Sequence, residues 1–155
     1  MSSKSLIIGS NGYLGSNMAW FLHEKGESFQ CFDTSKEPGE SWMPYNQLDI
    51  TNEEDVNQLD FECDFIYMYA GITGTDQGFS QIKTFFEINV LGLGNLLNAM
   101  KNASCRARII FPSTRLVYAG NRGVLIKEDD LKEPKTVYAL NKMACEYLLN
   151  MYANT

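Results

Sequence analysis

The chain alternates short apolar runs with longer segments in which apolar residues recur every three or four positions. A short apolar run bounded by turn residues predicts a β-strand, and the three-to-four spacing predicts an amphipathic helix. Strands that alternate with helices are typical of a parallel sheet covered by helices, an α/β fold. The runs predict five strands, at about 5–9, 28–33, 45–48, 63–70 and 107–113.

Four helices are predicted, three from their apolar period and one from a capping pattern. Thr51-Asn-Glu-Glu54 has the pattern of a capping box and predicts a short helix after the third strand. Two longer helices are predicted near 82–102 and 137–154. The first helix is predicted at about 13–25, with Gly26 as its C-terminal stop and an apolar face formed by Leu14, Met18, Phe21 and Leu22.

Size and charge limit the functions to be considered. The chain has 155 residues, about the size of one domain, and 45% of them are hydrophobic, enough for a sizeable core. Its net charge of -6 and its scattered Lys and Arg residues argue against a nucleic-acid partner, which requires a basic face. No apolar stretch approaches the thickness of a bilayer or has the form of a signal peptide, so we expect no membrane partner and a cytoplasmic location.

Metal binding and thiol chemistry are not expected from the pattern of cysteine and histidine. The four cysteines are far apart in the sequence and include no C-x-x-C pair, and His23 is the only histidine. We therefore expect no metal site and reduced thiols with a structural role. His23 is expected to be a solvated residue on a surface helix.

The first predicted strand runs into Gly9-Ser-Asn-Gly12-Tyr-Leu-Gly15, which opens the first predicted helix. A G-x-x-G-x-x-G turn in this position is typical of dinucleotide binding, because N–H groups at the helix N-terminus bind a diphosphate. A Cβ at Gly9 or Gly12 would obstruct the turn or the phosphate, and Gly15 allows close packing of helix and strand. The alternative is a tight turn with a structural role only. The candidate cofactor-binding residues of the loop are Gly9, Asn11, Gly12, Tyr13, Leu14 and Gly15.

An acidic residue at the end of the second predicted strand indicates which dinucleotide is bound. Asp33 follows Gly15 by 18 residues and is positioned to accept hydrogen bonds from both adenosine ribose hydroxyls. Its carboxylate would repel a 2'-phosphate, which favours NAD over NADP. Lys36 lies nearby and leaves NADP as the alternative.

A tyrosine and a lysine near the end of the chain are candidates for acid–base chemistry. Tyr138 and Lys142 are four residues apart and share one helical face. A free tyrosine has a pKa of about 10, so it is a poor base until a neighbouring cation lowers that pKa. Lys142 can be that cation and can also hydrogen-bond the nicotinamide ribose, which makes both residues candidate cofactor contacts. The alternative is a chance pair on a helix surface.

A hydroxyl partner for this pair follows the fifth predicted strand. Ser113 and Thr114 end that strand, at the edge where a parallel sheet presents its ligand. Either hydroxyl could polarise a substrate oxygen.

These motifs together resemble the N-terminal half of an extended short-chain dehydrogenase/reductase, of the NAD-dependent epimerase/dehydratase family that contains the UDP-galactose 4-epimerase-like enzymes. The resemblance spans essentially all 155 residues. Family members carry a Ser or Thr three positions before Val-Tyr, so Val117-Tyr118 assigns the catalytic hydroxyl to Thr114. The resemblance implies a three-layer Rossmann fold with a parallel sheet, in which Thr114, Tyr138 and Lys142 are catalytic. It also implies that residues 1–155 form a partial NAD-binding domain that lacks the C-terminal substrate lobe.

The resemblance implies further cofactor contacts. Asp49 and Ile50 match the pair that contacts adenine, although Asp49 could equally be a helix-entry residue. Asn89 matches a helix residue that supports the active site from behind, and the alternative is a buried Asn satisfied by backbone. The segment that passes under the adenosine and ribose is matched by Tyr69, Ala70 and Gly71.

Two departures from the family pattern bear on the reaction. In the 4,6-dehydratases the catalytic Thr is followed by Asp-Glu, whereas this chain has Arg115-Leu116, which disfavours dehydration. Family members usually read Val-Tyr-Gly, whereas Ala119 follows Tyr118 here, and Pro112 replaces a small polar residue. The loop after Thr114 is therefore expected to be shifted.

The resemblance implies an NAD-dependent, nucleotide-sugar epimerase-like cofactor domain, with hydride transfer at a sugar carbon and Tyr138 as acid and base. Activity of the 155-residue chain alone is a separate question, because the lobe that holds the nucleotide of the substrate is not expected here. One alternative is a non-catalytic NAD-binding regulatory module. The other is an interaction module that forms a homodimer through the helices near 82–102 and 137–154.

Overall fold

The computed structural model describes residues 4–74, 76–120, 123 and 125–153. The chain divides into two compact units. The first comprises Met1–Gly71 and Gly92–Pro112, and the second comprises Ile72–Leu91 and Ser113–Thr155. Each unit is described by itself below.

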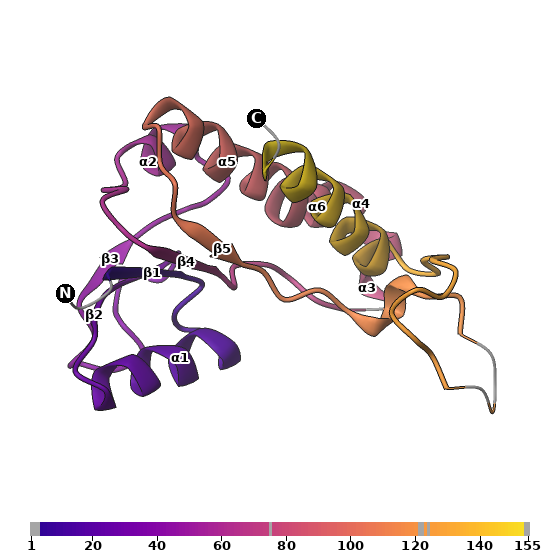
Figure 1. Cartoon of the computed structure of the whole chain (residues 1–155), viewed down its shortest axis with the longest axis horizontal. Coiled ribbons are helices and arrows are strands. Elements are labelled where there is room, and N and C mark those ends of the chain that lie inside the picture. Colours follow the sequence, from indigo (N-terminus) through magenta and orange to yellow (C-terminus); the bar gives the residue numbers. More distant parts are fainter. Residues whose placement is uncertain (1–3, 75, 121–122, 124, 154–155) are drawn as a thin grey trace. The chain divides into compact units, whose positions relative to one another are not determined.

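The first unit contains a five-stranded parallel sheet with the order β3-β2-β1-β4-β5 (Figure 1). The sheet confirms all five predicted strands, most of them shorter by a few residues. Because β1 lies between β2 and β4, the strand order reverses next to it, which is where open parallel sheets bind ligands. The strands are β1 (Lys4–Ile8), β2 (Ser28–Asp33), β3 (Tyr45–Gln47), β4 (Phe65–Met68) and β5 (Arg108–Ile110).

Helices lie on both faces of this sheet, which gives the first unit three layers. Figure 1 shows α1 (Tyr13–Glu24) on one side and α2 (Glu53–Asn57) and α5 (Gly92–Asn102) on the other. Side chains alternate along each strand, so β1 presents side chains to both faces of the sheet. The core under α1 is formed by Ile7, Ala19, Leu22, Cys31 and Met43.

The capping-box prediction for α2 is wrong by one residue. Asn52 is the N-cap, and its side-chain oxygen accepts a hydrogen bond from the backbone N–H of Glu54 at 3.0 Å. The Thr51 hydroxyl instead donates to Asp49 Oδ1 at 2.7 Å. Asn is at least as good an N-cap as Thr, and Asp49 provides Thr51 with a different partner.

The long helix predicted near 82–102 is interrupted. It comprises α4 (Ile82–Phe86), a π-helical turn η1 (Glu87–Leu91) and α5 in direct succession. A π-turn inserts one residue into the helical repeat, and apolar spacing does not reveal such an insertion. The boundary between the two units falls at the end of η1.

The second unit is built around the last helix, α6 (Val137–Ala153), which packs against α4 and η1. Its buried side chains include Phe85, Ala139 and Cys145. Two further elements, α3 (Gln77–Ser80) and the 3₁₀ turn η2 (Arg115–Val117), were not predicted because they are too short to show a period. None of the helices in the described part of the chain is long and apolar enough to cross a membrane.

Candidate cofactor and catalytic site

Gly9 and Gly15 are required by the fold of the turn between β1 and α1. Gly9 has a φ of +91°, and a Cβ there would lie 2.4 Å from the backbone N of Ala70. A Cβ on Gly15 would lie 2.1 Å from the Gly9 carbonyl oxygen. Both distances are far below van der Waals contact, so neither position can carry a side chain in this geometry.

Gly12 differs from the other two glycines. Its φ of -75° and ψ of 170° suit any residue, and among described atoms a Cβ there would meet only the Gly9 carbonyl oxygen, at an ordinary 3.4 Å. Gly12 is the N-cap of α1, and within the described structure no side chain caps the first-turn N–H groups. The fold therefore does not need a glycine here, and the open space lies at a helix N-terminus, where anions bind.

The carboxylate of Asp33 is fixed against this turn. Its Oδ2 accepts a hydrogen bond from the backbone N–H of Asn11 at 2.9 Å, and its Oδ1 accepts one from the N–H of Thr34 at 2.8 Å. The Asn11 side chain donates to Glu37 O and accepts from the N–H of Gly39. The residues predicted from sequence at the turn and at the end of β2 are thus brought together, while the Asn11 side chain binds the 34–44 loop.

The segment after β4 contacts the turn directly. The N–H groups of Tyr69 and Ala70 donate to the Ile8 carbonyl at 2.8 and 2.7 Å, which places Ala70 against Gly9. Tyr69 is half-buried and packs on the core under α1, and burial raises its pKa. Its ring therefore has a packing role in this structure.

Asp49 makes the local contacts of a helix-entry residue. Its Oδ1 accepts from the N–H of Thr51 at 2.9 Å and from the Thr51 hydroxyl. Ile50 is buried, and its carbonyl accepts from the Asn95 side chain at 3.0 Å. A contact of either residue with adenine stays a prediction.

In the second unit, Tyr138 and Lys142 share one face of α6, as their spacing predicts. Lys142 Nζ lies 5.8 Å from the centre of the Tyr138 ring. Burial raises the pKa of Tyr138, and burial also lowers the pKa of Lys142. The direction for Tyr138 is opposite to the lowering that we expected from Lys142, because desolvation disfavours both charged forms.

Thr114 and Ser113 have different partners, which separates the two candidate hydroxyls. Thr114 is the N-cap of η2, and its Oγ1 accepts from the N–H of Leu116 at 3.3 Å, so its own proton remains available for donation. Ser113 Oγ donates to Glu146 Oε1 on α6. Its hydroxyl proton is thus already used, which leaves Thr114 as the better group to polarise a substrate oxygen.

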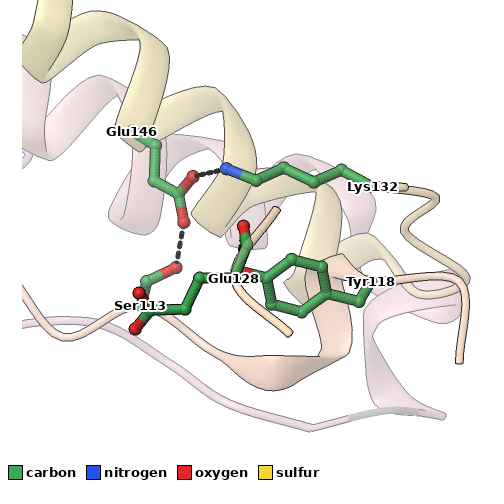
Figure 2. A network of polar contacts seen from close by, with 5 residues as sticks. All are labelled: Ser113, Tyr118, Glu128, Lys132 and Glu146. Atoms are coloured by element: carbon green, nitrogen blue, oxygen red, sulfur yellow. Dashed lines mark hydrogen bonds and ion pairs between the residues drawn. The ribbon is translucent and has the colours of Figure 1, made fainter. Parts of the chain in front are cut away.

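Glu146 is a residue that the sequence reasoning missed. Figure 2 shows its carboxylate between Ser113 and Lys132, whose Nζ lies 2.7 Å from Oε2. Although burial alone would raise the pKa of Glu146, hydrogen bonds from Lys132 and Ser113 lower it overall. Glu146 lies four residues after Lys142 and eight after Tyr138, so its place on their helical face was the available signal.

Asn89 is buried in η1 and has local partners. Its side-chain oxygen accepts from the N–H of Ile72 at 2.8 Å, and its Nδ2 donates to Ile72 O at 3.0 Å and to Asn141 Oδ1 at 3.3 Å. Its carbonyl accepts from the Cys145 thiol at 3.1 Å. Asn141 and Cys145 belong to α6, so Asn89 ties η1 to the helix that carries Tyr138 and Lys142.

His23 lies near the end of α1, in the first unit. Its ring is exposed and stacks on Trp42 with a centroid distance of 4.6 Å. Among the described residues there is no group of three or more His, Cys, Asp or Glu side chains that could hold a metal ion.

A parallel sheet with a positive-φ glycine turn after its central strand, and a carboxylate fixed to that turn, defines the Rossmann class. The family is shown by a match over residues 5–155 to the family model for the NAD dependent epimerase/dehydratase family. The chain therefore belongs to the NAD-dependent epimerase/dehydratase family, within the extended short-chain dehydrogenases/reductases. This confirms the resemblance and the fold class predicted from sequence.

Individual relatives have different activities. GDP-6-deoxy-D-talose 4-dehydrogenase of Aggregatibacter actinomycetemcomitans is 26% identical over 152 residues, which cover 96% of this chain and 48% of the relative. Among solved structures, UDP-glucose 4-epimerase of Thermus thermophilus in complex with NAD has the same fold, with a TM-score of 0.87 at 23% identity and coverage of 97% and 51%. dTDP-4-dehydrorhamnose reductase of Bacillus anthracis in complex with NADP has a TM-score of 0.81 at 26% identity, with coverage of 98% and 50%. The chain spans about half the length of the relatives that it matches.

Proposed function

We propose that this chain binds NAD at the glycine turn and is the cofactor domain of a nucleotide-sugar epimerase or reductase. The observation that carries the proposal is Gly12, a glycine that the fold does not need, at an uncapped helix N-terminus. A Cβ there would occupy the space in which a diphosphate approaches the N–H groups. A turn with a purely structural role would not require glycine at this position.

The residues around the turn fit such a cofactor. N–H groups at the start of α1 bind the diphosphate, and the Asp33 carboxylate accepts from the adenosine ribose hydroxyls. One Asp33 oxygen already bonds the Asn11 N–H, which fixes the carboxylate at the turn. Its charge favours NAD over NADP, although a reductase related to this chain was solved with NADP. Bound NAD supplies a hydride acceptor.

Tyr138 is the proposed acid and base, and Thr114 donates a hydrogen bond to the same substrate oxygen. The raised pKa of Tyr138 keeps it protonated at neutral pH, which is the form that gives a proton to a ketone oxygen. Removal of a proton from a sugar hydroxyl requires tyrosinate. Lys142 is the proposed cation that stabilises this ionised form of Tyr138. A sugar that binds next to Lys142 and keeps it charged would therefore favour the oxidative direction.

The two residues after Thr114 limit the class of reaction that we propose. Arg115 and Leu116 stand where dehydratases carry their Asp-Glu pair, so the proposed chemistry is epimerisation or reduction without loss of water. Arg115 is exposed, and Leu116 is half-buried in η2. Neither side chain can supply the carboxylates that dehydration needs.

A non-catalytic NAD-binding or dimerisation module is the second candidate. One observation favours it: α6 exposes Leu140, Tyr147 and Met151. In this case Tyr138 and Lys142 would be present without a substrate to act on. Titration alone does not separate this module from an enzyme, whereas turnover does.

Calorimetric titration with NAD and then with NADP tests the proposal, with Asp33→Ala as the control. Saturable NAD binding that is stronger than NADP binding, and is weakened in Asp33→Ala, supports the cofactor site. Preference for NADP would contradict the role of Asp33. Absence of binding to either would leave the glycine turn as a structural feature. Epimerisation of a nucleotide-sugar, or oxidation of NADH by a keto-sugar nucleotide, that is lost in Tyr138→Phe with NAD affinity retained then separates an enzyme from a binding module.

A further inference from the structure

Two of the four cysteines lie at the starts of neighbouring strands. Cys63 comes two residues before β4, and Cys105 comes three residues before β5. The strands are parallel, with Phe65 paired to Arg108, and the N–H of Arg108 donates to Asp64 O at 2.8 Å. Both cysteines therefore lie at the amino edge of the sheet in the first unit, although 42 residues separate them in the sequence.

The separation of the two chain segments suits a disulfide. Adjacent strands lie about 4.8 Å apart, and the Cα atoms of a disulfide lie roughly 4.4–6.8 Å apart. Both thiols are free and only half-buried, so a small oxidant can reach them. Cys31 and Cys145, in contrast, are fully buried.

The two thiols also affect each other. The pKa of Cys63 is raised to about 12, first by burial and then by the neighbouring Cys105 thiol. Cys105 Sγ accepts a hydrogen bond from the N–H of Ala107 at 3.4 Å. The raised pKa disfavours the Cys63 thiolate, so we expect Cys105 to be the first of the two to react.

The fold holds Cys105 in position. Ser104, with a φ of 54°, ends α5 in the left-handed conformation, and the N–H of Cys105 donates to Met100 O at 2.8 Å. This is a hydrogen-bonded helix C-terminus. Cys105 is therefore presented by an ordered turn.

We propose that Cys63 and Cys105 form an oxidisable dithiol that a peroxide closes to an intramolecular disulfide. The Cys105 thiol attacks one peroxide oxygen, which forms a sulfenic acid and releases one water from hydrogen peroxide. The Cys63 sulfur then attacks the sulfenic sulfur, loses its proton and releases a second water. Two thiols and one peroxide thus become one disulfide and two waters.

The disulfide would stabilise the first unit. It would join the start of β4 to the turn between α5 and β5, and close a loop of 42 residues, which restricts the unfolded chain. We expect the oxidised chain to melt several degrees higher than the reduced chain, and a thiol reductant to reverse the shift.

The test treats the folded full chain with one equivalent of hydrogen peroxide, removes the peroxide, then unfolds the chain in urea with N-ethylmaleimide to block the remaining thiols, and maps peptides by mass spectrometry. We expect a cross-linked peptide pair containing Cys63 and Cys105, with Cys31 and Cys145 still blocked by the reagent. Cys63→Ser and Cys105→Ser should each abolish the cross-link, and Cys145→Ser, the matched control, should retain it.

Peptide mapping of the unsubstituted chain decides the proposal even where a variant fails to fold. Over-oxidation of one cysteine without a cross-link, or a disulfide between two chains, would overturn it. So would a cross-link that includes Cys31 or Cys145, because those residues require unfolding to react. A cross-linked chain whose melting temperature does not rise would overturn the stabilising role.

Discussion

At the scale of single residues, the glycines of the turn differ in whether the fold requires them. Gly15 faces the Gly9 carbonyl with no room for a Cβ, whereas Gly12 has an ordinary conformation and open space. The sequence motif alone does not distinguish the two positions. In the structure the fold requires a glycine at position 15 and not at position 12, and the proposed role of Gly12 in NAD binding can be tested by substitution.

We expect Gly15→Ala to destabilise the fold and Gly12→Ala to weaken NAD binding without unfolding the chain. A Cβ at position 15 would lie 2.1 Å from Gly9 O, and the resulting shift of α1 should cost more than about 2 kcal/mol. Gly12→Ala should change stability by less than about 1 kcal/mol and reduce NAD affinity at least about tenfold. Urea denaturation and calorimetry measure the two effects. Equal NAD affinity in Gly12→Ala would contradict the proposed site.

The Lys132–Glu146 pair predicts a particular dependence of stability on pH. The pKa of Glu146 is lowered in the folded state, so its contribution is present above the unfolded pKa near 4.5 and is lost as pH falls through the folded value. The pKa of Lys132 is raised by Glu146, so its contribution is complete below 10.5 and is lost as pH rises through the folded value. The Lys132–Glu146 pair therefore makes its full contribution to the free energy of unfolding between pH 4.5 and pH 10.5.

We expect Lys132→Met to lower the free energy of unfolding by about 0.5–1 kcal/mol at pH 7, because the pair is only partly shielded from solvent. The difference from the unsubstituted chain should shrink as the pH falls below 4.5. Lys83→Met is the control, since Lys83 and Glu87 form a longer and more exposed pair at 3.5 Å. Urea denaturation at several pH values measures the effect. A loss that is the same at acid pH would show that packing of the lysine stem, and not its charge, is responsible.

At the scale of secondary-structure elements, the sequence predicted the strands and longer helices but not the local hydrogen bonds that set their ends and interruptions. The sequence pattern predicted all five strands, which include the buried central strands β1 and β4 and the more exposed edge strands β3 and β5. The N-cap of α2 was misplaced because Thr51 and Asn52 are both good caps, and the choice depends on Asp49. The turn η1 was missed because its apolar spacing is the same as that of an α-helix.

In the candidate site too, the sequence predicted features that lie within one element and missed contacts between distant segments. The glycine turn, Asp33 and the shared face of Tyr138 and Lys142 follow from spacing within single elements or from strand order. The contact of Glu146 with Ser113 joins segments that are far apart in the sequence, and no local pattern encodes it. The pKa of Tyr138 likewise depends on burial, which only the folded chain determines.

The hydrogen bonds of the Asn89 side chain in η1 predict that this residue stabilises the fold, whether or not it also acts in function. Asn89→Ala would leave the N–H of Ile72 and a side-chain oxygen of Asn141 without their present partner, in a buried setting. We expect a loss of about 1–3 kcal/mol in the free energy of unfolding. Urea denaturation measures it, with Asn57→Ala, an exposed amide on α2, as a control that should change stability by less than about 0.5 kcal/mol. A loss no larger than that of the control would show that water replaces the Asn89 contacts.

At the scale of the whole molecule, the proposed function draws on both compact units. The glycine turn, Asp33 and the 69–71 segment belong to the first unit, whereas Thr114, Tyr138 and Lys142 belong to the second. A cofactor held by the first unit alone would account for binding but not for chemistry. The proposed chemistry additionally needs Thr114, Tyr138 and Lys142, which belong to the second unit.

Hydrogen exchange with and without NAD tests this requirement on the intact chain. Protection of amides in 9–15 and 69–71 would report binding to the first unit, because those segments form and contact the glycine turn. If Tyr138 and Lys142 also contact the cofactor, the amides of 138–142 should become protected at the same NAD concentration. Gly12→Ala should remove both effects together, since one site would produce them. Protection confined to the first unit would favour the non-catalytic binding module, because the acid–base pair would then be unaffected by the cofactor.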